Sequence, residues 1–424
     1  MSWSAWRATM VASVLVAAAC AGGTPSGRDG ARGAAPAAYA SPGCIVGRVP
    51  LTVGDDTFAY IEHEGFFQVE SGFVVVGTPT YTWAVGADGV RFRESQDAHL
   101  AAKFGLDGRA TLFEKPVDVP IGSAQTVRLG GDRWGVLFDE LHPDSIDQLS
   151  RSQRLWYAEH DGVRWTTIES VPFPELGRPE MTRSSDLVRT DEGLTWVAAI
   201  GLPDGFTELM EYNRRGGGWT IDPISDDWVE QSALAFAPGT GLVLAHFAHD
   251  TELPGFQKSY RLFRKSAGGW DLVRRLAVGE PGSLVWTMHV AVVGDDPAVG
   301  WYVDARSGAG AYVAHGLDAD GDRAPTRLDA SAFQIVPLGP DRGRAAWLVR
   351  HVDAAEERAE LRLFHTRAGG AVELTAAAPS PYAGSAAAML TAPSEALVIG
   401  AEVSLDPMNG YVRSLILRLT PSCV

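Results

Sequence analysis

The chain has 424 residues, of which 46% are hydrophobic, which is enough for a sizeable buried core. It carries 36 Lys and Arg against 52 Asp and Glu. The formal net charge of −16 argues against nucleic acid and against an anionic membrane face as direct partners. A cation or a basic protein is compatible with this charge.

The N-terminal residues have the layout of a secretory signal. Arg7 precedes an apolar run, ATMVASVLVAAA (8–19), which is too short to span a bilayer. The following VAAAC resembles the lipobox of bacterial lipoproteins, although Ala17 stands where that pattern prefers Leu. The resemblance implies a signal peptide over 1–19 and a lipid on Cys20. Ordinary cleavage without lipidation is the alternative.

The resemblance also implies a place in the cell. In bacterial lipoproteins an Asp after the lipidated cysteine signals retention in the inner membrane, and Ala21 stands there instead. We therefore expect a lipid anchor in the cell envelope, at the outer membrane, facing either the periplasm or the cell surface. Residues 20–43 are Cys20 and a stretch of Gly, Ala, Pro and Ser that cannot bury a core. Such a tether spans roughly 25 Å.

Residues 44–424 have the signature of an all-β domain. Short apolar segments alternate with Gly, Pro and Asp, and no long segment keeps a helical period. One strand-like element recurs seven times, about 54 residues apart, a period that suits propeller blades of four strands. Its copies are GFVVVG (72–77), DRWGVLF (132–138), GLTWVAAI (193–200), GLVLAHF (241–247), PAVGWYV (297–303), RAAWLVR (344–350) and EALVIGAE (395–402). We expect a β-propeller of seven blades, with six or eight as alternatives.

A second element follows the first: a hairpin with a tight Asp-Gly or Gly-Gly turn and an aromatic residue just after it. We expect this aromatic residue to pack between blades. The hairpins resemble degenerate copies of the Asp-box turn of sialidase-type propellers, and no copy has the full Ser-Asp-Gly-Trp set in register. The resemblance supports the fold and not sialidase chemistry. The turn and aromatic positions are Asp88-Gly89 with Phe92, Asp161-Gly162 with Trp165, Gly217 with Trp219, and Gly269 with Trp270.

Two cysteines, Cys44 and Cys423, stand at the two ends of the folded region. The segments CIVGRVPL (44–51) and SLILRLTPSCV (414–424) are both strand-like. A propeller often joins its first and last blades by pairing N- and C-terminal strands in one sheet. We therefore expect these strands to pair, and a Cys44–Cys423 disulfide to lock the ring in an oxidising compartment.

Motifs with a defined chemistry are few. The sequence contains no H-E-x-x-H, G-x-S-x-G, P-loop or C-x-x-C pattern. DADGDRAPTRLD (318–329) resembles an EF-hand calcium loop but has Arg323 where that loop needs Gly. Calcium is the one cofactor this suggests, and a blade hairpin turning at Asp320-Gly321 is the alternative. The calcium ligands would be Asp318, Asp320, Asp322 and Asp329.

The connections between the second and third strands of the blades are long and mostly acidic. They are expected at 138–153, 247–258, 350–360 and 402–412, all at the end of the ring where propellers generally bind ligands. Tolerated surface insertion is the alternative. The candidate binding residues are Asp139, Glu140, His142, Asp144, Asp147, His249, Asp250, Glu252, Asp353, Glu356, Glu357 and Asp406.

The sequence favours a non-enzymatic binding or scaffolding module, held at the membrane by its N-terminal lipid. Its ligand would be a cation, a basic protein or a glycan. The alternative is a sialidase-like carbohydrate-active hydrolase. A pair of carboxylates about 5 to 10 Å apart in a central pocket would favour the hydrolase.

Replacing Cys20 with Ser should release the protein from membranes into the soluble fraction, because the lipid would have no attachment site. Fractionation of cells that express each form, followed by immunoblotting, measures this. A wild-type protein that is already soluble would contradict the lipid anchor.

Overall fold

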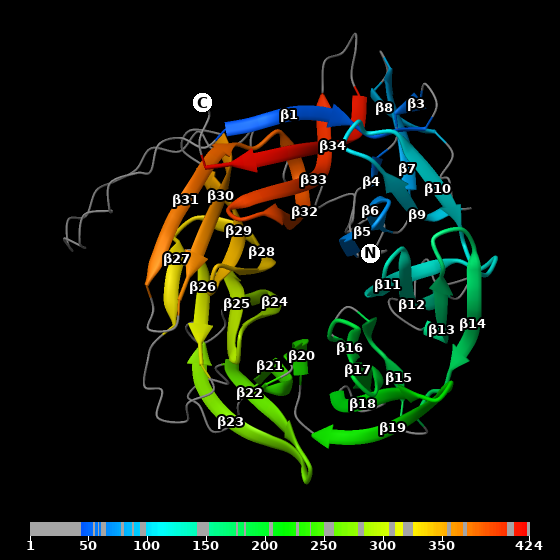
Figure 1. Cartoon of the computed structure of the whole chain (residues 1–424), viewed down its shortest axis with the longest axis vertical. Helices are drawn as coiled ribbons and strands as arrows, with labels where there is room; N and C mark the ends of the chain where they lie inside the picture. Colours follow the sequence, from blue (N-terminus) through cyan, green and yellow to red (C-terminus); the bar gives the residue numbers. More distant parts are fainter. Residues whose placement is uncertain are drawn as a thin grey trace.

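Seven antiparallel sheets stand as blades around a central axis in the computed structural model (Figure 1). The structure describes residues 44–421 with gaps, of which the longest are 142–151, 250–257 and 317–324. The described residues contain no α-helix. Within them, no helix is long and apolar enough to cross a membrane. The chain therefore forms an all-β, seven-bladed propeller, as the repeat predicted.

Each blade has four strand positions, and the chain runs from the innermost position outward. Blade 1 consists of β5 (Gly65–Val69), β6 (Gly72–Val76), β9 (His99–Phe104) and β10 (Ala110–Glu114). Blade 2 consists of β11 (Ile121–Gly130), β12 (Arg133–Leu141), β13 (Ser152–His160) and β14 (Trp165–Val171). Blade 3 consists of β15 (Arg178–Pro179) with β16 (Val188–Thr190), then β17 (Gly193–Gly201), β18 (Thr207–Arg215) and β19 (Gly218–Ser225). In blade 3, β15 and β16 share the innermost position, because both pair with β17.

The remaining blades follow the same order. Blade 4 consists of β20 (Val229–Ala237), β21 (Gly241–His249), β22 (Lys258–Ser266) and β23 (Gly269–Val278), and blade 5 of β24 (Leu284–Val293), β25 (Asp296–Asp304), β26 (Gly310–His315) and β27 (Thr326–Asp329). Blade 6 consists of β28 (Ala332–Asp341), β29 (Arg344–Asp353), β30 (Arg358–Thr366) and β31 (Val372–Pro379). Blade 7 consists of β32 (Tyr382–Ala392), β33 (Glu395–Ser404), β34 (Tyr411–Thr420) and the N-terminal strand β1 (Cys44–Pro50). The recurring apolar segment is the second strand of every blade. These strands are apolar because they are covered on both faces: Leu194 to Ile200 of β17 are all buried.

The N-terminal strand completes blade 7. β1 pairs antiparallel with β34, from Cys44 opposite Thr420 to Pro50 opposite Leu415. Figure 1 shows them side by side. Arg48 of β1 also forms an ion pair with Glu402 of β33 at 2.7 Å. The predicted closure by terminal strands is confirmed. Cys423 lies outside the described residues, so its disulfide with Cys44 stays a prediction.

One hairpin is not where the sequence pattern put it. The segment with Asp88-Gly89 forms β7 (Thr80–Gly86) and β8 (Gly89–Arg93), which are inserted between β6 and β9. β9 takes the third position of blade 1, because its Leu100, Ala101 and Ala102 are fully buried against the neighbouring strands. β7 instead pairs with the start of β34 and with β4 (Ala59–Tyr60). A separate short hairpin joins β2 (Thr52–Val53) to β3 (Asp56–Thr57).

Aromatic residues after the outer turns join adjacent blades, as expected. Trp165 Nε1 donates to the carbonyl oxygen of Glu114 in blade 1, at 2.9 Å. Trp219 Nε1 donates to Glu169 in blade 2, at 2.8 Å, and Trp270 Nε1 donates to Glu211 in blade 3, at 2.9 Å. Each tryptophan therefore bonds to the preceding blade.

Basic residues of the third strands reinforce two of these junctions. Arg214 Nε donates to Glu169 at 2.6 Å, and its Nη1 donates to Glu159 at 3.1 Å. Lys265 pairs with Glu211 in the same way. The carboxylates that accept hydrogen bonds from Trp219 and Trp270 thus also neutralise a cation.

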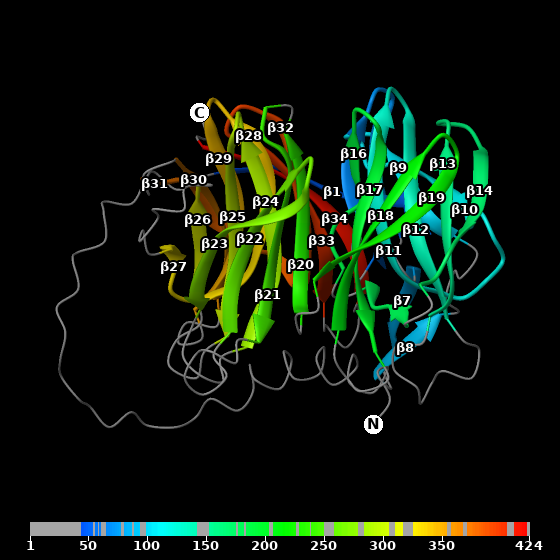
Figure 2. The same ribbon diagram turned by 90° about the horizontal axis from the view of Figure 1, so that it is seen from below.

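The two ends of the ring differ. Turns between first and second strands, and between third and fourth strands, lie at one end, called here the turn end (Figure 2). Connections from second to third strands and from blade to blade belong to the opposite loop end. The second-to-third connections are shorter than predicted, because the strands continue on both sides of each: the residues between strands are 142–151, 250–257, 354–357 and 405–410.

Glu169→Ala should lower the free energy of unfolding by about 2 kcal/mol, because it leaves Trp219 Nε1 and Arg214 Nε without their acceptor. Chemical denaturation measures this. The control is Glu192→Ala, which removes an ion pair with Arg215 in which both side chains are more than 60% exposed. It should change stability by less than about 0.5 kcal/mol. Equal losses in the two variants would contradict the role assigned to Glu169.

Candidate functional site

Asp139 and Glu140 lie on a strand rather than in the predicted acidic loop. β12 continues to Leu141, and both acids bond within blade 2. Asp139 is buried and accepts a hydrogen bond from the backbone N of Ser123 at 2.5 Å. Glu140 accepts one from Trp156 Nε1 at 2.9 Å. These contacts tie β12 to the strands on either side of it.

Most of the other predicted loop residues lie outside the described part of the chain. His249 and Asp353 end β21 and β29, so their backbones do lie at the loop end. Their side chains are outside the description. The acidic loop site therefore stays a prediction. The residues outside are His142, Asp144, Asp147, Asp250, Glu252, Glu356, Glu357 and Asp406.

Of the four predicted calcium ligands, the structure describes Asp329. Its carboxylate lies 2.8 Å from His351 Nδ1 and 2.8 Å from Arg362 Nη1. Burial raises the pKa of Asp329, but the hydrogen bonds from His351 and Ser331 outweigh it and hold that pKa below its usual range. Asp329 thus joins blade 5 to blade 6. Asp318, Asp320 and Asp322 lie outside the description, and no group of three acids, histidines or cysteines among the described residues could hold a metal ion.

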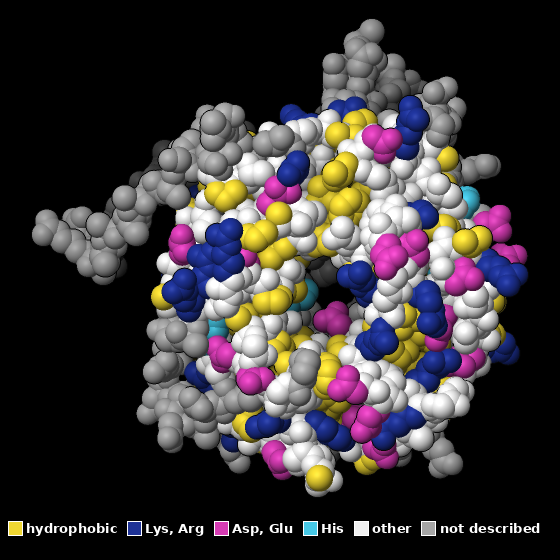
Figure 3. Space-filling view, viewed as in Figure 1, with side chains coloured by type: hydrophobic (Ala, Val, Ile, Leu, Met, Phe, Trp, Pro, Cys, Tyr) yellow, Lys and Arg dark blue, Asp and Glu magenta, His cyan; other side chains and the backbone are white. Residues whose placement is uncertain are grey.

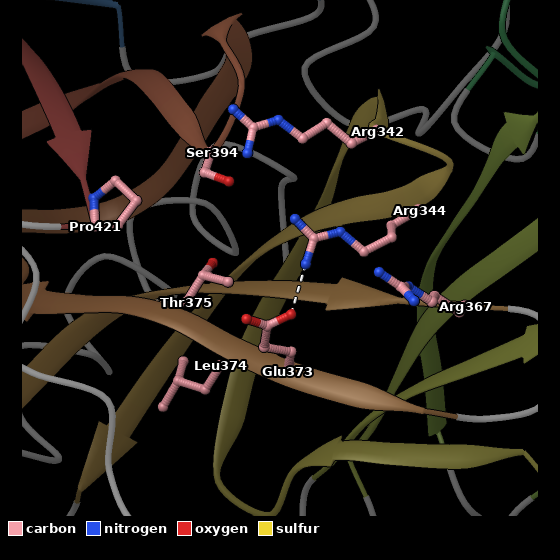
Figure 4. A pocket seen from close by; sticks show the side chains of 8 residues that line it. All are labelled: Arg342, Arg344, Arg367, Glu373, Leu374, Thr375, Ser394 and Pro421. Carbon is pink, nitrogen blue, oxygen red and sulfur yellow. Dashed lines mark hydrogen bonds and ion pairs between the residues drawn. The ribbon is translucent and has the colours of Figure 1, made fainter.

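A pocket of about 490 Å³ opens between blades 6 and 7 at the turn end (Figure 4). Blade 6 supplies two turns and blade 7 supplies one turn and the end of its third strand. Figure 3 shows the turn end, with basic side chains gathered over blade 6. The lining residues are Arg342, Arg344, Arg367, Glu373, Leu374, Thr375, Ser394 and Pro421.

Backbone strain gathers at this pocket. Among the described residues, Arg342 (φ 51°) and Ser394 (φ 60°) are the two residues other than glycine with positive φ. Arg342 and Gly343 form the tight turn between β28 and β29. Ser394 follows Pro393 in the turn between β32 and β33. A side chain in this conformation costs of order 1 kcal/mol, and such residues cluster at ligand sites. Both of them line the same pocket.

A hydrogen-bonded network forms the floor of the pocket. Asp341 Oδ2 accepts from His365 Nε2 at 2.7 Å and from the hydroxyl of Ser394 at 3.1 Å. His365 Nδ1 lies 3.0 Å from Thr375 Oγ1. The network joins blade 6 to blade 7, so it fixes the two sides of the pocket relative to each other.

The floor network has a defined charge. Burial raises the pKa of Asp341, but the hydrogen bonds from His365 and Ser394 hold it below its usual range. Burial and the nearby Arg344 lower the pKa of His365. Asp341 is therefore ionised and His365 neutral at pH 7. Both imidazole nitrogens are engaged by Asp341 and Thr375, so His365 does not act as a base toward Ser394.

The three arginines differ in their partners. Arg344 forms ion pairs with Glu373 at 2.5 Å and with Asp341 at 3.7 Å, yet its buried Nε atom has no hydrogen-bond partner. The side chains of Arg342 and Arg367 are exposed, and within the described structure neither has a hydrogen bond or an ion pair. Figure 4 shows all three on one side of the pocket. The site thus holds two cations that no described residue neutralises.

The innermost strand positions carry two further groups with shifted pKa values. Ser185 N donates to the carbonyl oxygen of Val197 on β17, so the chain at Ser185 and Asp186 occupies an innermost strand position. Asp186 is exposed to solvent, yet the surrounding protein desolvates it and raises its pKa to about 6. His289, half-buried on β24, has its pKa lowered to about 4 by desolvation. Figure 3 shows acidic and histidine surface at the central opening.

The arginine pocket has no motif that marks it in the sequence. The segments DRGR (341–344) and TRAGG (366–370) each look like an ordinary hairpin turn. The signal that would have found them is their position. A first-to-second turn and a third-to-fourth turn of one blade lie at the same end, so their arginines are brought together.

Comparisons with known proteins bear on the fold alone. No family model matches the chain, and no curated protein matches it. Solved structures with a similar fold include an α-L-arabinofuranosidase of Fusarium graminearum (12% identity, TM-score 0.44, 70% of this chain and 93% of that one). They also include the lectin BP39L of Burkholderia pseudomallei (13%, 0.46, 79% and 91%) and the sialidase of Trypanosoma rangeli (11%, 0.41, 73% and 56%). The neighbours thus include sialidase-type propellers, and at these identities no activity is transferred.

The His289 side chain should titrate near pH 4, measured by NMR of its ring protons. An unfolded histidine binds its proton near pH 6.5, so as pH falls from 6.5 toward 4 the unfolded state takes up the proton first and stability is lost. His289→Gln should therefore flatten the fall in unfolding free energy over that range. A ring that titrates at its ordinary pKa, with an unchanged slope in the variant, would refute this.

Proposed function

We propose that the protein is a non-enzymatic ligand-binding module of the bacterial cell envelope, anchored by a lipid on Cys20. Its ligand site is the pocket between blades 6 and 7. The propeller supplies a rigid ring, and the pocket supplies a preformed concave site at one junction of that ring.

The observation that carries this proposal is that residues with a strained backbone conformation line the pocket. Arg342 and Ser394, the two strained residues among those described, both line the pocket, and Asp341 holds Ser394 there by two hydrogen bonds. Unfavourable backbone conformations persist where the surroundings over-determine them. A turn with glycine at position 342 or 394 would form without this cost. We therefore infer that the Arg342 guanidinium and the Ser394 hydroxyl have a role in binding a ligand in the pocket.

A sialidase-like hydrolase is the second candidate, and Asp186 is the observation that favours it. A carboxyl group with a pKa of about 6, exposed at an innermost strand position, is suited to general acid catalysis. Glycoside hydrolysis also needs a second carboxylate about 5 to 10 Å away. In that case Asp186→Asn would abolish turnover of the substrate.

The test is a panel of mono- and disaccharides and small organic acids, with binding measured by calorimetry and turnover by chromatography. The wild-type protein should bind at least one member saturably and leave it chemically unchanged. Pro421→Trp, which fills the pocket from its blade 7 side, should weaken that binding at least tenfold. The matched control is Val163→Trp, at a fully solvated position (84% exposed) in a turn of blade 2, which should not.

Two results would overturn the proposal. Binding that Pro421→Trp leaves intact would remove the pocket as the site. Turnover of a bound sugar that Asp186→Asn abolishes would establish the hydrolase instead.

A further inference from the structure

Within the proposed binding function, on which this inference rests, we propose that the ligand is a small hydroxylated organic anion. A carboxylate or phosphate group of this anion lies between Arg342 and Arg367. A sugar acid and a sugar phosphate are the two sources of such a group.

The charge balance of the pocket calls for an anion. Arg344 is already matched by Glu373 and by Asp341 beneath it. Arg342 and Arg367 have no carboxylate partner in the described part of the chain, although acids outnumber bases in the whole protein by 52 to 36. Two uncommitted cations beside a third repel one another. A bound anion removes that repulsion.

The chemistry of the exposed donors suits a planar or tetrahedral oxyanion. Guanidinium groups match carboxylate and phosphate oxygens with two parallel hydrogen bonds, which an ammonium group cannot do. The backbone of Arg342 is held in its positive-φ turn, and the backbone N of Arg367 donates to the carbonyl oxygen of Ala371 at 3.1 Å. Arg344 adds positive charge beside them, although its Nε atom is buried and faces no ligand.

The size and remaining lining of the pocket indicate an uncharged body attached to the anionic group. About 490 Å³ falls in the range of pockets for small organic ligands and exceeds the need of an inorganic ion. Thr375 and Ser394 present hydroxyl oxygens that keep acceptor lone pairs for a ligand hydroxyl. Leu374 and Pro421 present apolar edges that suit the carbon face of a sugar ring.

The arginine pocket is distinct from the acidic connections and from the central channel. It lies at the turn end, opposite to the acidic connections that the sequence favoured, and on a blade junction rather than in the central channel. The whole chain has a net charge of −16, so three arginines in one pocket run against the charge of the protein.

The experiment measures binding of glucuronate, glucose 6-phosphate and glucose to the full-length mature protein by calorimetry. Glucuronate carries a carboxylate, glucose 6-phosphate a phosphate, and glucose neither. The wild-type protein should bind at least one of the two anions at least tenfold more tightly than glucose, and the affinity should fall as NaCl is raised. The stronger of the two anions identifies the source of the charged group.

Arg342→Gln and Arg367→Gln should each weaken anion binding about tenfold, and the double variant about a hundredfold. Arg342→Lys should lose affinity despite its charge, because the planar fork is gone. The control is Arg109→Gln, which removes an arginine that is 87% exposed from the equivalent outer turn of blade 1. It should leave binding unchanged. Since neither pocket arginine has a described partner, the variants should keep the melting temperature of the wild type.

The outcomes separate this inference from the proposed function. If no anion binds at millimolar concentration, or if the double variant binds as the wild type does, the anion inference is wrong. If glucose or another neutral ligand binds and Pro421→Trp abolishes it while the arginine variants do not, the pocket stands as a ligand site and the inference alone falls.

Discussion

The pairing of β1 with β34 is the contact on which the rest of the molecule depends. It joins residues at opposite ends of the folded chain, through six paired positions from Cys44 with Thr420 to Pro50 with Leu415. Without it, blade 7 would lack its outer strand, and the short pairing of β34 with β7 would be the main backbone link between the two ends of the ring. With it, every blade has two neighbours, and the junction contacts of Trp165, Trp219 and Trp270 belong to a closed circle. Closure places the largest entropic cost on one strand pair, because the loop it closes is nearly the whole domain.

The pocket between blades 6 and 7 is a consequence of that closure. Its blade 7 side consists of the turn at Ser394 and the residue after β34, and both keep their places because β34 lies between β33 and β1. Its blade 6 side is fixed by Asp341, which holds His365 within the blade and Ser394 across the junction. The charges follow from this frame. The charge of Arg344 is neutralised by its ion pairs with Glu373 and Asp341. Arg342 and Arg367 are exposed to solvent and have no partner among the described residues.

The distribution of chemistry between the two ends of the ring differs from that expected of the long acidic connections. Among the described acids at the loop end, Asp139, Glu140 and Asp329 serve as acceptors within or between blades. The uncommitted cations lie at the turn end, in connections short enough to look purely structural. Short turns hold the backbone more rigidly than long loops do, so they fix the positions from which the arginine side chains extend.

The sequence by itself determined the fold: seven apolar second strands at a regular spacing, tight turns followed by tryptophan, and two strand-like ends. These features are local, because a few consecutive residues determine strand alternation, the type of turn and whether a strand is apolar enough to be buried on both faces. Only the tertiary structure decided which side chains meet. Arg342, Arg367 and Ser394 converge across 52 residues of chain because two adjacent blades expose their turns at the same end. The hairpin β7–β8 lies outside the order of blade 1, where β9 pairs with β6 instead. The partners of a side chain are set by neighbouring blades, and that information lies in the packing of the ring rather than in any single segment.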